Sequence, residues 1–279
     1  MGNTKNILVV NDDGIEAIGI HKLAEALSGA GNVYVCSPHV QQSASGHGIT
    51  IGRMVYVEDA PFEEATHAIS MEGTPADCVK IGLEVYRSRG VEMDMVFSGF
   101  NHGHNLGTDT LYSGTVSAAI EGAMCGLPSA AMSISICSGR RNHMPPDHFD
   151  SAMELARKIA KSDFFSQRAM RDSKVEDIFY INKNHVILNI NVPDLPPGEI
   201  KGVKACPLSF RAYDEWFQEK RDASGRVGYH YSGLPHVVGE TTPDESDVIA
   251  DMEHYATITP LCFDLTNYRM LETLRDVHF

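Results

Sequence analysis

The first 36 residues read as a strand, a helix and a second strand, and this pattern constrains the fold more than any other feature of the sequence. Residues 7–10 are a continuous apolar run, which is typical of a parallel strand buried on both faces. Apolar residues then recur near helical spacing over residues 15–27, and glycine follows. Residues 33–36 form a second apolar run. Parallel strands joined by a helix make right-handed crossover units, so we expect an α/β fold.

The same rhythm continues along most of the chain. We predict further strands at residues 93–97, 127–136, 186–192, 200–206 and 255–261, and helices at residues 74–86, 116–125 and 148–165. These elements extend the expected sheet and supply helices to cover it.

Residues 207–245 depart from this rhythm, because they are aromatic, polar and interrupted by glycine. Residues 222–225 are a candidate hairpin tip. We therefore predict an extended C-terminal β-arm over residues 207–245, beside a single core domain of residues 1–206 and 246–279. The arm carries an aromatic cluster of Phe210, Tyr213, Trp216 and Phe217. Such clusters favour subunit contacts, so we expect the arm to serve oligomerisation, and a folded-back lid is the alternative.

Size and charge exclude several classes of protein. The chain has 279 residues, and its formal net charge of −14 argues against a nucleic-acid-binding surface. A small anionic substrate is still compatible, because a metal ion reverses the local sign. No stretch approaches the run of about 20 apolar residues of a membrane helix, and no signal peptide is recognisable. We expect a cytoplasmic protein with no membrane contact. Six scattered cysteines lack zinc or CxxC spacing, so structural disulfides are not expected.

Two adjacent carboxylates, Asp12 and Asp13, follow the first predicted strand. Ligands of open parallel sheets bind at the carboxyl ends of the strands. Neighbouring carboxylates repel each other in a low dielectric, and a hard cation such as Mg²⁺, Mn²⁺ or Ca²⁺ relieves this repulsion. The alternative is a turn in which Asp13 caps the next helix. Haloacid-dehalogenase-like phosphatases space their aspartates differently, and response-regulator receivers lack the glycine-rich loop described next.

A glycine-rich loop, residues 98–114, follows the strand predicted at residues 93–97. Glycines let backbone N–H groups approach an anion, and the N-terminus of the following helix adds donors and a positive dipole. Ser113, Gly114 and Thr115 therefore form a candidate phosphate cradle, which is compatible with helix capping. Neither GxGxxG nor GxxxxGK[ST] occurs, so a dinucleotide or nucleoside-triphosphate loop is disfavoured.

Two further features leave alternatives open. Ser43 lies in the loop after the second predicted strand, where its hydroxyl could complete a metal shell. The serine could also be a nucleophile, although no GxSxG elbow surrounds it, or the loop could simply be flexible. His102 and His104 form an HxH pair, which binds zinc in some proteins, but nothing in the sequence places further zinc ligands.

Taken together, these motifs resemble the SurE (survival protein E) family of 5′-nucleotidases and acid phosphatases. The matching segments are residues 11–14, Ser43 within residues 38–45, residues 73–78, the loop and helix start at residues 98–116, residues 118–122, residues 189–193 and residues 257–261. The resemblance covers almost the whole chain in order.

The resemblance implies a Rossmann-like fold, in which a mostly parallel sheet has helices on both faces. It also implies homodimers or tetramers that exchange C-terminal elements. The activity implied is a divalent-metal-dependent phosphomonoesterase, a 5′-nucleotidase that converts nucleoside monophosphates to nucleoside and phosphate, with short polyphosphate as a further candidate substrate. One ion, Mg²⁺ or Mn²⁺, with Ca²⁺ also able to occupy the site, would be the cofactor.

Site residues follow from matching positions. The implied metal ligands are Asp12, Asp13, Ser43 and Asn101. Ser113, Gly114 and Thr115 would hold the phosphate oxygens, and Asn105 and Asp109 would order the loop or bind the substrate. Asp12 and Asp13 are also the candidate catalytic groups, as base or as aspartyl nucleophile. A metal-bound water is the preferred nucleophile, because carboxylates that bind a metal are poor nucleophiles.

The chain departs from the family pattern at His39, Gln42 and His254, and His102 and His104 occupy variable positions. These departures bear on substrate preference rather than on the reaction. Two competing hypotheses remain: a non-enzymatic nucleotide- or phosphate-binding regulator that uses the same loops, and a metal-dependent deacetylase or sugar hydrolase built around the two histidines.

Overall fold

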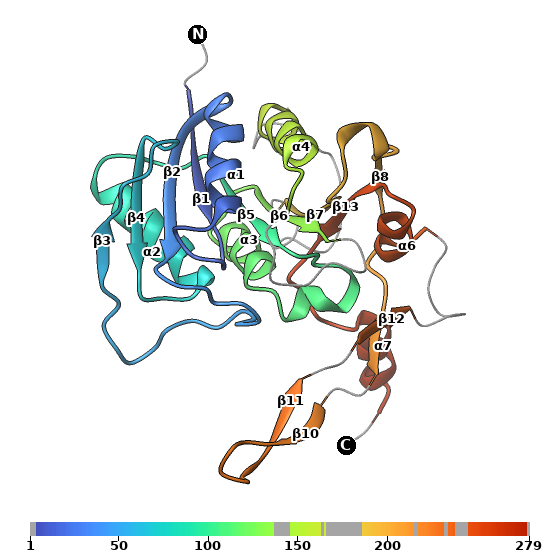
Figure 1. Ribbon diagram of the computed structural model, residues 1–279. Coiled ribbons are helices and arrows are strands. Elements are labelled where there is room, and N and C mark those ends of the chain that lie inside the picture. Colours follow the sequence, from blue (N-terminus) through green and yellow to red (C-terminus); the bar gives the residue numbers. More distant parts are fainter. Residues whose placement is uncertain are drawn as a thin grey trace.

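The computed structural model describes residues 4–136, 146–162, 165, 186–214, 217–231, 234–237 and 245–277. A mixed sheet of nine strands forms its centre (Figure 1). These strands are β1 (Lys5–Val10), β2 (Gly31–Pro38), β3 (Val57–Asp59), β4 (His67–Met71), β5 (Met95–His102), β6 (Ser129–Ser135), β7 (Ile187–Pro193), β8 (Val203–Ala205) and β13 (Ala256–Leu261). The helices are α1 (Ile18–Ser28), α2 (Pro75–Ser88), α3 (Gly114–Met124), α4 (Asp150–Lys161), α6 (Asp247–Met252) and α7 (Tyr268–Arg275), with 3-10 turns η1 (Gly107–Leu111) and η2 (Pro197–Glu199).

Successive side chains of β1 point to opposite faces of the sheet and pack against two different layers of helices. Ile7 and Val9 belong to a buried cluster that includes residues of α1 and α4, whereas Leu8 and Val10 belong to a second cluster with residues of α2. α1 contacts α4 and α2 contacts α3, so each face of the sheet carries a helix pair (Figure 1). Burial on both faces explains why β1 is apolar at every position from 7 to 10.

Strand order identifies the edge at which a ligand is expected. The order is β3-β4-β2-β1-β5-β6-β7-β13-β8. The strands from β4 to β7 in this row run parallel, whereas β3 and β13 pair antiparallel with β4 and β7. The chain passes from β1 to β2 on one side and returns to β5 on the other. The topological switch point therefore lies between β1 and β5, and ligands of such sheets bind outside the carboxyl ends of the strands there.

The predicted α/β fold is confirmed, but the structure differs from the prediction in several details. β5 continues to His102, so Asn101 and His102 lie in the strand rather than in the loop after it. Its pairing with β6 shifts register between Ser98 and Asn101. β3 and β4 were not predicted, and the short helices α6 and α7 were also missed. α2 begins as expected, with Pro75 in its first turn and a capping box between Thr74 and Asp77.

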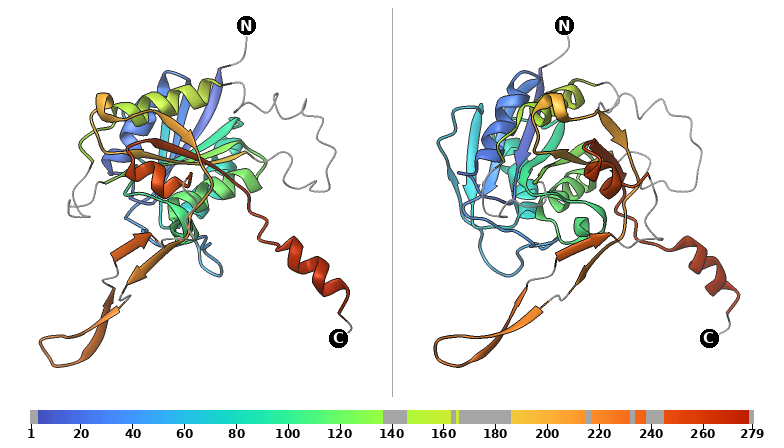
Figure 2. Two further views of the ribbon diagram at one scale, coloured as in Figure 1. Left: turned by 90° about the vertical axis from the view of Figure 1, so that its right-hand side faces the viewer. Right: turned by 45° about the vertical axis from the view of Figure 1, so that its right-hand side comes forward.

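The described residues from Arg211 to Val237 form a projecting β-structure (Figures 1 and 2). β9 (Arg211–Asp214) pairs with β12 (Leu234–Val237), and β10 (Phe217–Arg221) pairs with β11 (Val227–Tyr231), both antiparallel. The turn that joins β10 to β11 is the predicted tip, where the N–H of Gly225 donates to the carbonyl of Asp222 (2.9 Å). Trp216 lies outside the described residues.

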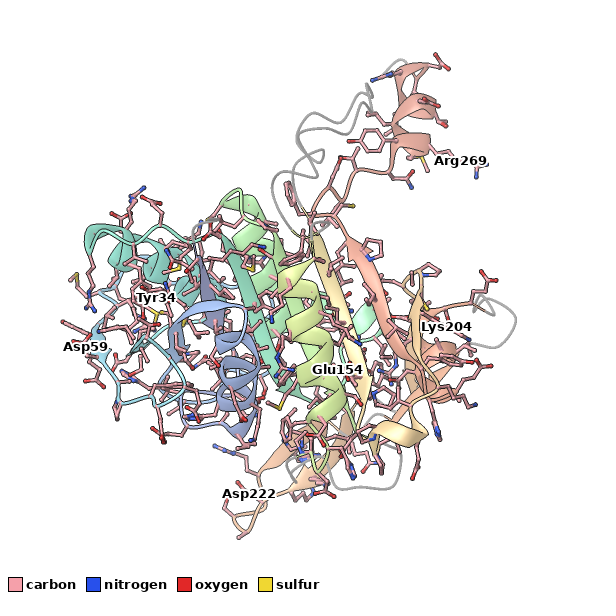
Figure 3. The ribbon with its side chains drawn as sticks, turned by 90° about the horizontal axis from the view of Figure 1, so that it is seen from above. Tyr34, Asp59, Glu154, Lys204, Asp222 and Arg269 are labelled. Carbon is pink, nitrogen blue, oxygen red and sulfur yellow. The ribbon has the colours of Figure 1, made fainter. Side chains whose placement is uncertain are left out.

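The C-terminal helix α7 also leaves the core, on a different side from the arm (Figure 2, left). None of its residues is buried. Seen from above, Arg269 on α7 and Asp222 at the arm tip lie at opposite ends of the molecule (Figure 3). Within the described part of the chain, no helix is long and apolar enough to span a membrane. Five cysteines there are free thiols, and Cys137 lies outside it.

Candidate active site

Asp12 and Asp13 lie directly after β1 at the switch point, in a tight turn. Asn11 donates its side-chain amide to the carbonyl of Gly14 (2.8 Å), and Gly14 has a φ of 99°, a conformation that favours glycine. The hydroxyl of Thr115 donates to Oδ1 of Asp12 (2.6 Å). The backbone N–H of His102 donates to Oδ2 of Asp13 (3.0 Å). Each carboxylate is thus held from the neighbouring strand or helix.

Burial destabilises the charged form of both carboxylates. Burial raises the pKa of Asp12 to about 7, with a second contribution from the negative charge of Asp13. Burial also raises the pKa of Asp13. Asp12 is only 4% exposed, so water does little to screen this pair. A cation between these carboxylates would remove the penalty, which favours the metal hypothesis over a simple capping turn.

The loop after β2 brings Ser43 to Asp13 through a shared partner. Gln41 donates its amide nitrogen to Oδ1 of Asp13 (3.1 Å) and to the Ser43 hydroxyl (2.9 Å). The backbone N–H of Gln42 donates to the carbonyl of Asp12 (2.7 Å). Ser43 is exposed, on the rim of the site. Gln41 was not among the predicted site residues, because the turn at residues 43 and 44 that brings it beside Ser43 and Asp13 has no clear signal in the sequence.

Two buried acids on helices anchor the far part of this loop. Glu121 of α3 accepts from Lys80 and pairs with His47 (2.6 and 2.9 Å). Burial alone would raise the pKa of Glu121, but His47 and Lys80 hold it below its ordinary value. Asp77 of α2 accepts from the hydroxyl of Thr50 (2.6 Å). Residues 47–50 are therefore fixed to α2 and α3, which limits where Ser43 can lie.

Asn101 completes the predicted ligand set from β5. Its amide nitrogen donates to the carbonyl of Gly103 (2.8 Å), so its amide oxygen is the atom that would serve a cation. A cavity of about 430 Å³ is lined by Asp12, Ser43, Ala44, Asn101, His102, Gly103, His104, Asn105, Asp109, Tyr112, Ser113 and Tyr213. Asp13 lines a second cavity of about 240 Å³, and His102 lines both.

The donor set suits a hard divalent cation. Two carboxylates, a hydroxyl and an amide oxygen are oxygen ligands of the kind that Mg²⁺, Mn²⁺ and Ca²⁺ prefer. Residues 4–136 and the other described ranges contain no group of three or more His, Cys, Asp or Glu side chains that could hold a metal. Within the same ranges, Ser45 Oγ and His102 Nε2 are buried without a hydrogen-bond partner. Unpaired polar atoms beside a site indicate a missing ligand or water.

The predicted phosphate cradle lies at the start of α3. Ser113 is the N-cap and accepts from the N–H of Val116 (3.0 Å). A Cβ added to Gly114 would lie 2.9 Å from Cβ of Asp12, so only glycine leaves space between the helix start and the carboxylate. Thr115 is occupied in orienting Asp12 rather than directed at open space. The helix N-terminus and the carboxylate pair are thus adjacent.

Asn105 and Asp109 both have protein partners. The N–H of Asn105 donates to Asn191, and its side-chain amide donates to Ser133 (2.7 and 2.8 Å). Asp109 accepts from the guanidinium of Arg211 and the hydroxyl of Tyr213, two residues of the arm. These bonds favour the loop-ordering role for both residues, and a direct role at the substrate stays a prediction.

The two histidines differ in environment. Burial, followed by the positive charge of Arg211, lowers the pKa of His104 to about 4, so its imidazole is neutral near pH 7. His102 stands beside Asp13 and lines both cavities. Arg211 and Tyr213 were not predicted as site residues. No local signal marks them, because their contacts with Asp109 join positions 102 and 104 residues apart.

Known proteins match this chain over nearly its whole length. The family model described as "Survival protein SurE" matches residues 7–215. A protein named 5′-nucleotidase SurE from Clostridium botulinum strain 657 is 39% identical over 267 residues, covering 96% of both chains. Its counterpart from Pelotomaculum thermopropionicum is 40% identical over 270 residues, covering 96% of this chain and 93% of that one. The crystal structure of the SurE protein from Aquifex aeolicus has a TM-score of 0.73 at 34% identity, and the match covers 97% of this chain and 98% of that one.

Proposed function

The chain belongs to the SurE family and is an enzyme of the 5′-nucleotidase class, and on that premise we propose that it hydrolyses nucleoside 5′-monophosphates to nucleoside and phosphate with a divalent cation. One observation carries the proposal. Asp12, Ser43, Asn101 and Ser113, from the ends of three neighbouring strands and the start of α3, line one cavity at the switch point. Asp13 joins them through Gln41.

The cation would be held by Asp12, Asp13, Ser43 and Asn101. When bound, it would act as a Lewis acid that binds a phosphate oxygen and polarises phosphorus. Thr115 and the N–H of His102 keep the two carboxylates in place. Gln41 fixes the Ser43 hydroxyl. Such fixed groups lower the reorganisation that the reaction would otherwise require.

The phosphate would lie at the N-terminus of α3. The first N–H groups of a helix have no partner within it, and the helix dipole favours an anion there. The backbone N–H of Thr115 bonds to Asp12, so Gly114 would be the main backbone donor to the phosphate and Thr115 would share its N–H between the two. These donors would stabilise the charge that builds on the non-bridging oxygens as the ester bond breaks. Asp12 or Asp13 would accept the proton of the water that attacks phosphorus, and this proton would pass to the 5′-oxygen of the departing nucleoside as the ester bond breaks.

A phosphate-release assay tests the function. The full chain should release inorganic phosphate from nucleoside 5′-monophosphates when Mg²⁺ or Mn²⁺ is present, and EDTA should abolish release. Short polyphosphate belongs in the same panel as a further candidate substrate. Saturable nucleotide binding without phosphate release would instead support the regulator hypothesis.

We also propose that the chain forms a homodimer or tetramer through its projecting C-terminal elements. α7 exposes Tyr268, Met270, Leu271 and Leu274, and the residues around it add Leu265 and Val277. An eight-residue helix without buried side chains is not stable alone in water, so a second copy of the chain is the expected partner. Replacing Leu271 and Leu274 by Lys should reduce the mass measured by light scattering. A single mass shared by variant and wild type would contradict this proposal.

A further inference from the structure

The 430 Å³ cavity is lined by two chemically different sets of residues. One set comprises Asp12, Ser43, Asn101 and Ser113, beside which the phosphate is proposed to bind. The other comprises the ring-bearing residues His104, Tyr112 and Tyr213. A cavity of this volume is within the usual range for small-molecule sites, about 300–1,000 Å³, and exceeds what a phosphate group alone requires. The remaining space must suit the group esterified to the phosphate.

Tyr213 is a wall residue that the fold holds in place. Its hydroxyl donates to Asp109. The guanidinium of Arg211 donates to the other oxygen of Asp109 and lies 5.9 Å from the centre of the Tyr213 ring. Arg211 is only 9% exposed, so this ion pair is largely shielded from water. The ring is therefore held by one hydrogen bond to Asp109, whose carboxylate is held in turn by Arg211.

Further contacts join the base of the arm, residues 209–213, to that same loop. The hydroxyl of Thr108 donates to the carbonyl of Arg211 (3.1 Å). A Cβ on Gly107 would lie only 2.5 Å from the carbonyl oxygen of Ser209, so the two segments are packed as closely as glycine permits. Asp247, which is fully buried, accepts from the N–H groups of both Gly107 and Ser209 (2.7 and 2.9 Å). The arm base thus belongs structurally to the site.

We propose that Tyr213 is a specificity-determining residue, whose ring contacts the base of a nucleoside monophosphate while Asp109 and Arg211 act as positioning residues. The inference rests on the proposed function and deepens it by assigning the base to the arm side of the cavity. An aromatic face stacks on any nucleobase, so Tyr213 would favour nucleotides over phosphate esters without a base, with little choice among bases. Tyr112 also lines the cavity but is 57% exposed, which makes it the weaker candidate for this contact.

The test compares two ligands that differ by the base alone. KM for AMP is measured, together with the inhibition constant of ribose 5-phosphate as a competitor of AMP hydrolysis. Tyr213→Ala should raise KM for AMP about 10-fold, the loss expected for one stacking contact, and should change the inhibition constant of ribose 5-phosphate by no more than about 2-fold. Tyr213→Phe keeps the ring and should restore most of the AMP affinity.

Tyr229→Ala is the matched control, because Tyr229 is a tyrosine of the same arm, exposed on β11. It should leave both constants at their wild-type values. An unchanged KM for AMP in Tyr213→Ala would overturn the proposal. So would an equal loss for both ligands, which would mean that Tyr213 only orders the loop. A 10-fold rise in Phe149→Ala instead would place the base in the 240 Å³ cavity. Failure of the wild type to hydrolyse AMP would reject the proposed function itself, so the two failures are distinguishable.

Discussion

Asp13→Asn is expected to lower phosphate release from nucleoside monophosphates by about 10²–10³-fold, the loss typical when one preorganised electrostatic group is removed from an active site. The substitution keeps the shape of the side chain. Its amide oxygen can still accept from the N–H of His102, a bond of 3.0 Å in the present structure. The change therefore removes the charge that would hold a cation while leaving the local hydrogen bond in place. Initial rates at saturating Mg²⁺ or Mn²⁺ measure the effect.

Asp94→Asn provides the matched control, because it makes the same chemical change just before the start of β5, at the end of the strand away from Asn101. Asp94 accepts from the N–H of Asn6 (2.7 Å) just before β5 begins, and an asparagine can accept the same bond. Its turnover should equal that of the wild type. Turnover of Asp13→Asn close to that of the wild type would reject the assignment of the site. Melting curves without divalent cations exclude unfolding as the cause of a loss.

The arrangement of the candidate ligands could be predicted because it depends on sheet topology. Asp12 follows β1, Ser43 follows β2 and Asn101 lies near the end of β5, and these three strands are neighbours in the sheet. Parallel strands with adjacent carboxyl ends bring such residues together whatever the loops do in detail. The strand–helix–strand pattern was therefore enough to bring the Ser43 loop beside Asp12, whereas the assignment of Ser43 and Asn101 as ligands came from the family resemblance.

The contacts made by Asp109 and His104 could not be predicted from the local sequence pattern. Tyr213 and Arg211 bond to Asp109 across more than 100 residues, and a polar aromatic stretch gives no sign of such pairing. Asp109 was assigned to loop order or substrate, and only the structure reveals its two arm partners. His104 could not be distinguished from a surface histidine, since its lowered pKa comes from burial by distant segments. Tertiary packing, rather than propensity, decides these features.

The cation-free protein is expected to lose stability as the pH rises, and divalent cations are expected to restore it. The pKa of Asp12 is about 7 when folded and 3.8 in its ordinary state, so below pH 3.8 the carboxyl is protonated in both states and has no effect. Between these values the unfolded chain ionises first, and the folded state loses about 1.4 kcal/mol per pH unit. Above pH 7 the loss is complete, at about 4 kcal/mol for Asp12. The raised pKa of Asp13 acts in the same direction.

A cation that binds the two carboxylates competes with protons, so its effect on the melting temperature should grow with pH. At a concentration 100 times its dissociation constant at pH 8, Mg²⁺ or Mn²⁺ should raise the melting temperature by about 5–10 °C, with a much smaller rise at pH 5. Asp12→Asn should melt higher than the wild type at pH 8 without cations, because the buried charge is gone, and should not respond to them. Glu16→Gln, at an exposed carboxylate nearby, should behave as the wild type does. Equal shifts at pH 5 and pH 8, or a full shift in Asp12→Asn, would show that the cation binds elsewhere.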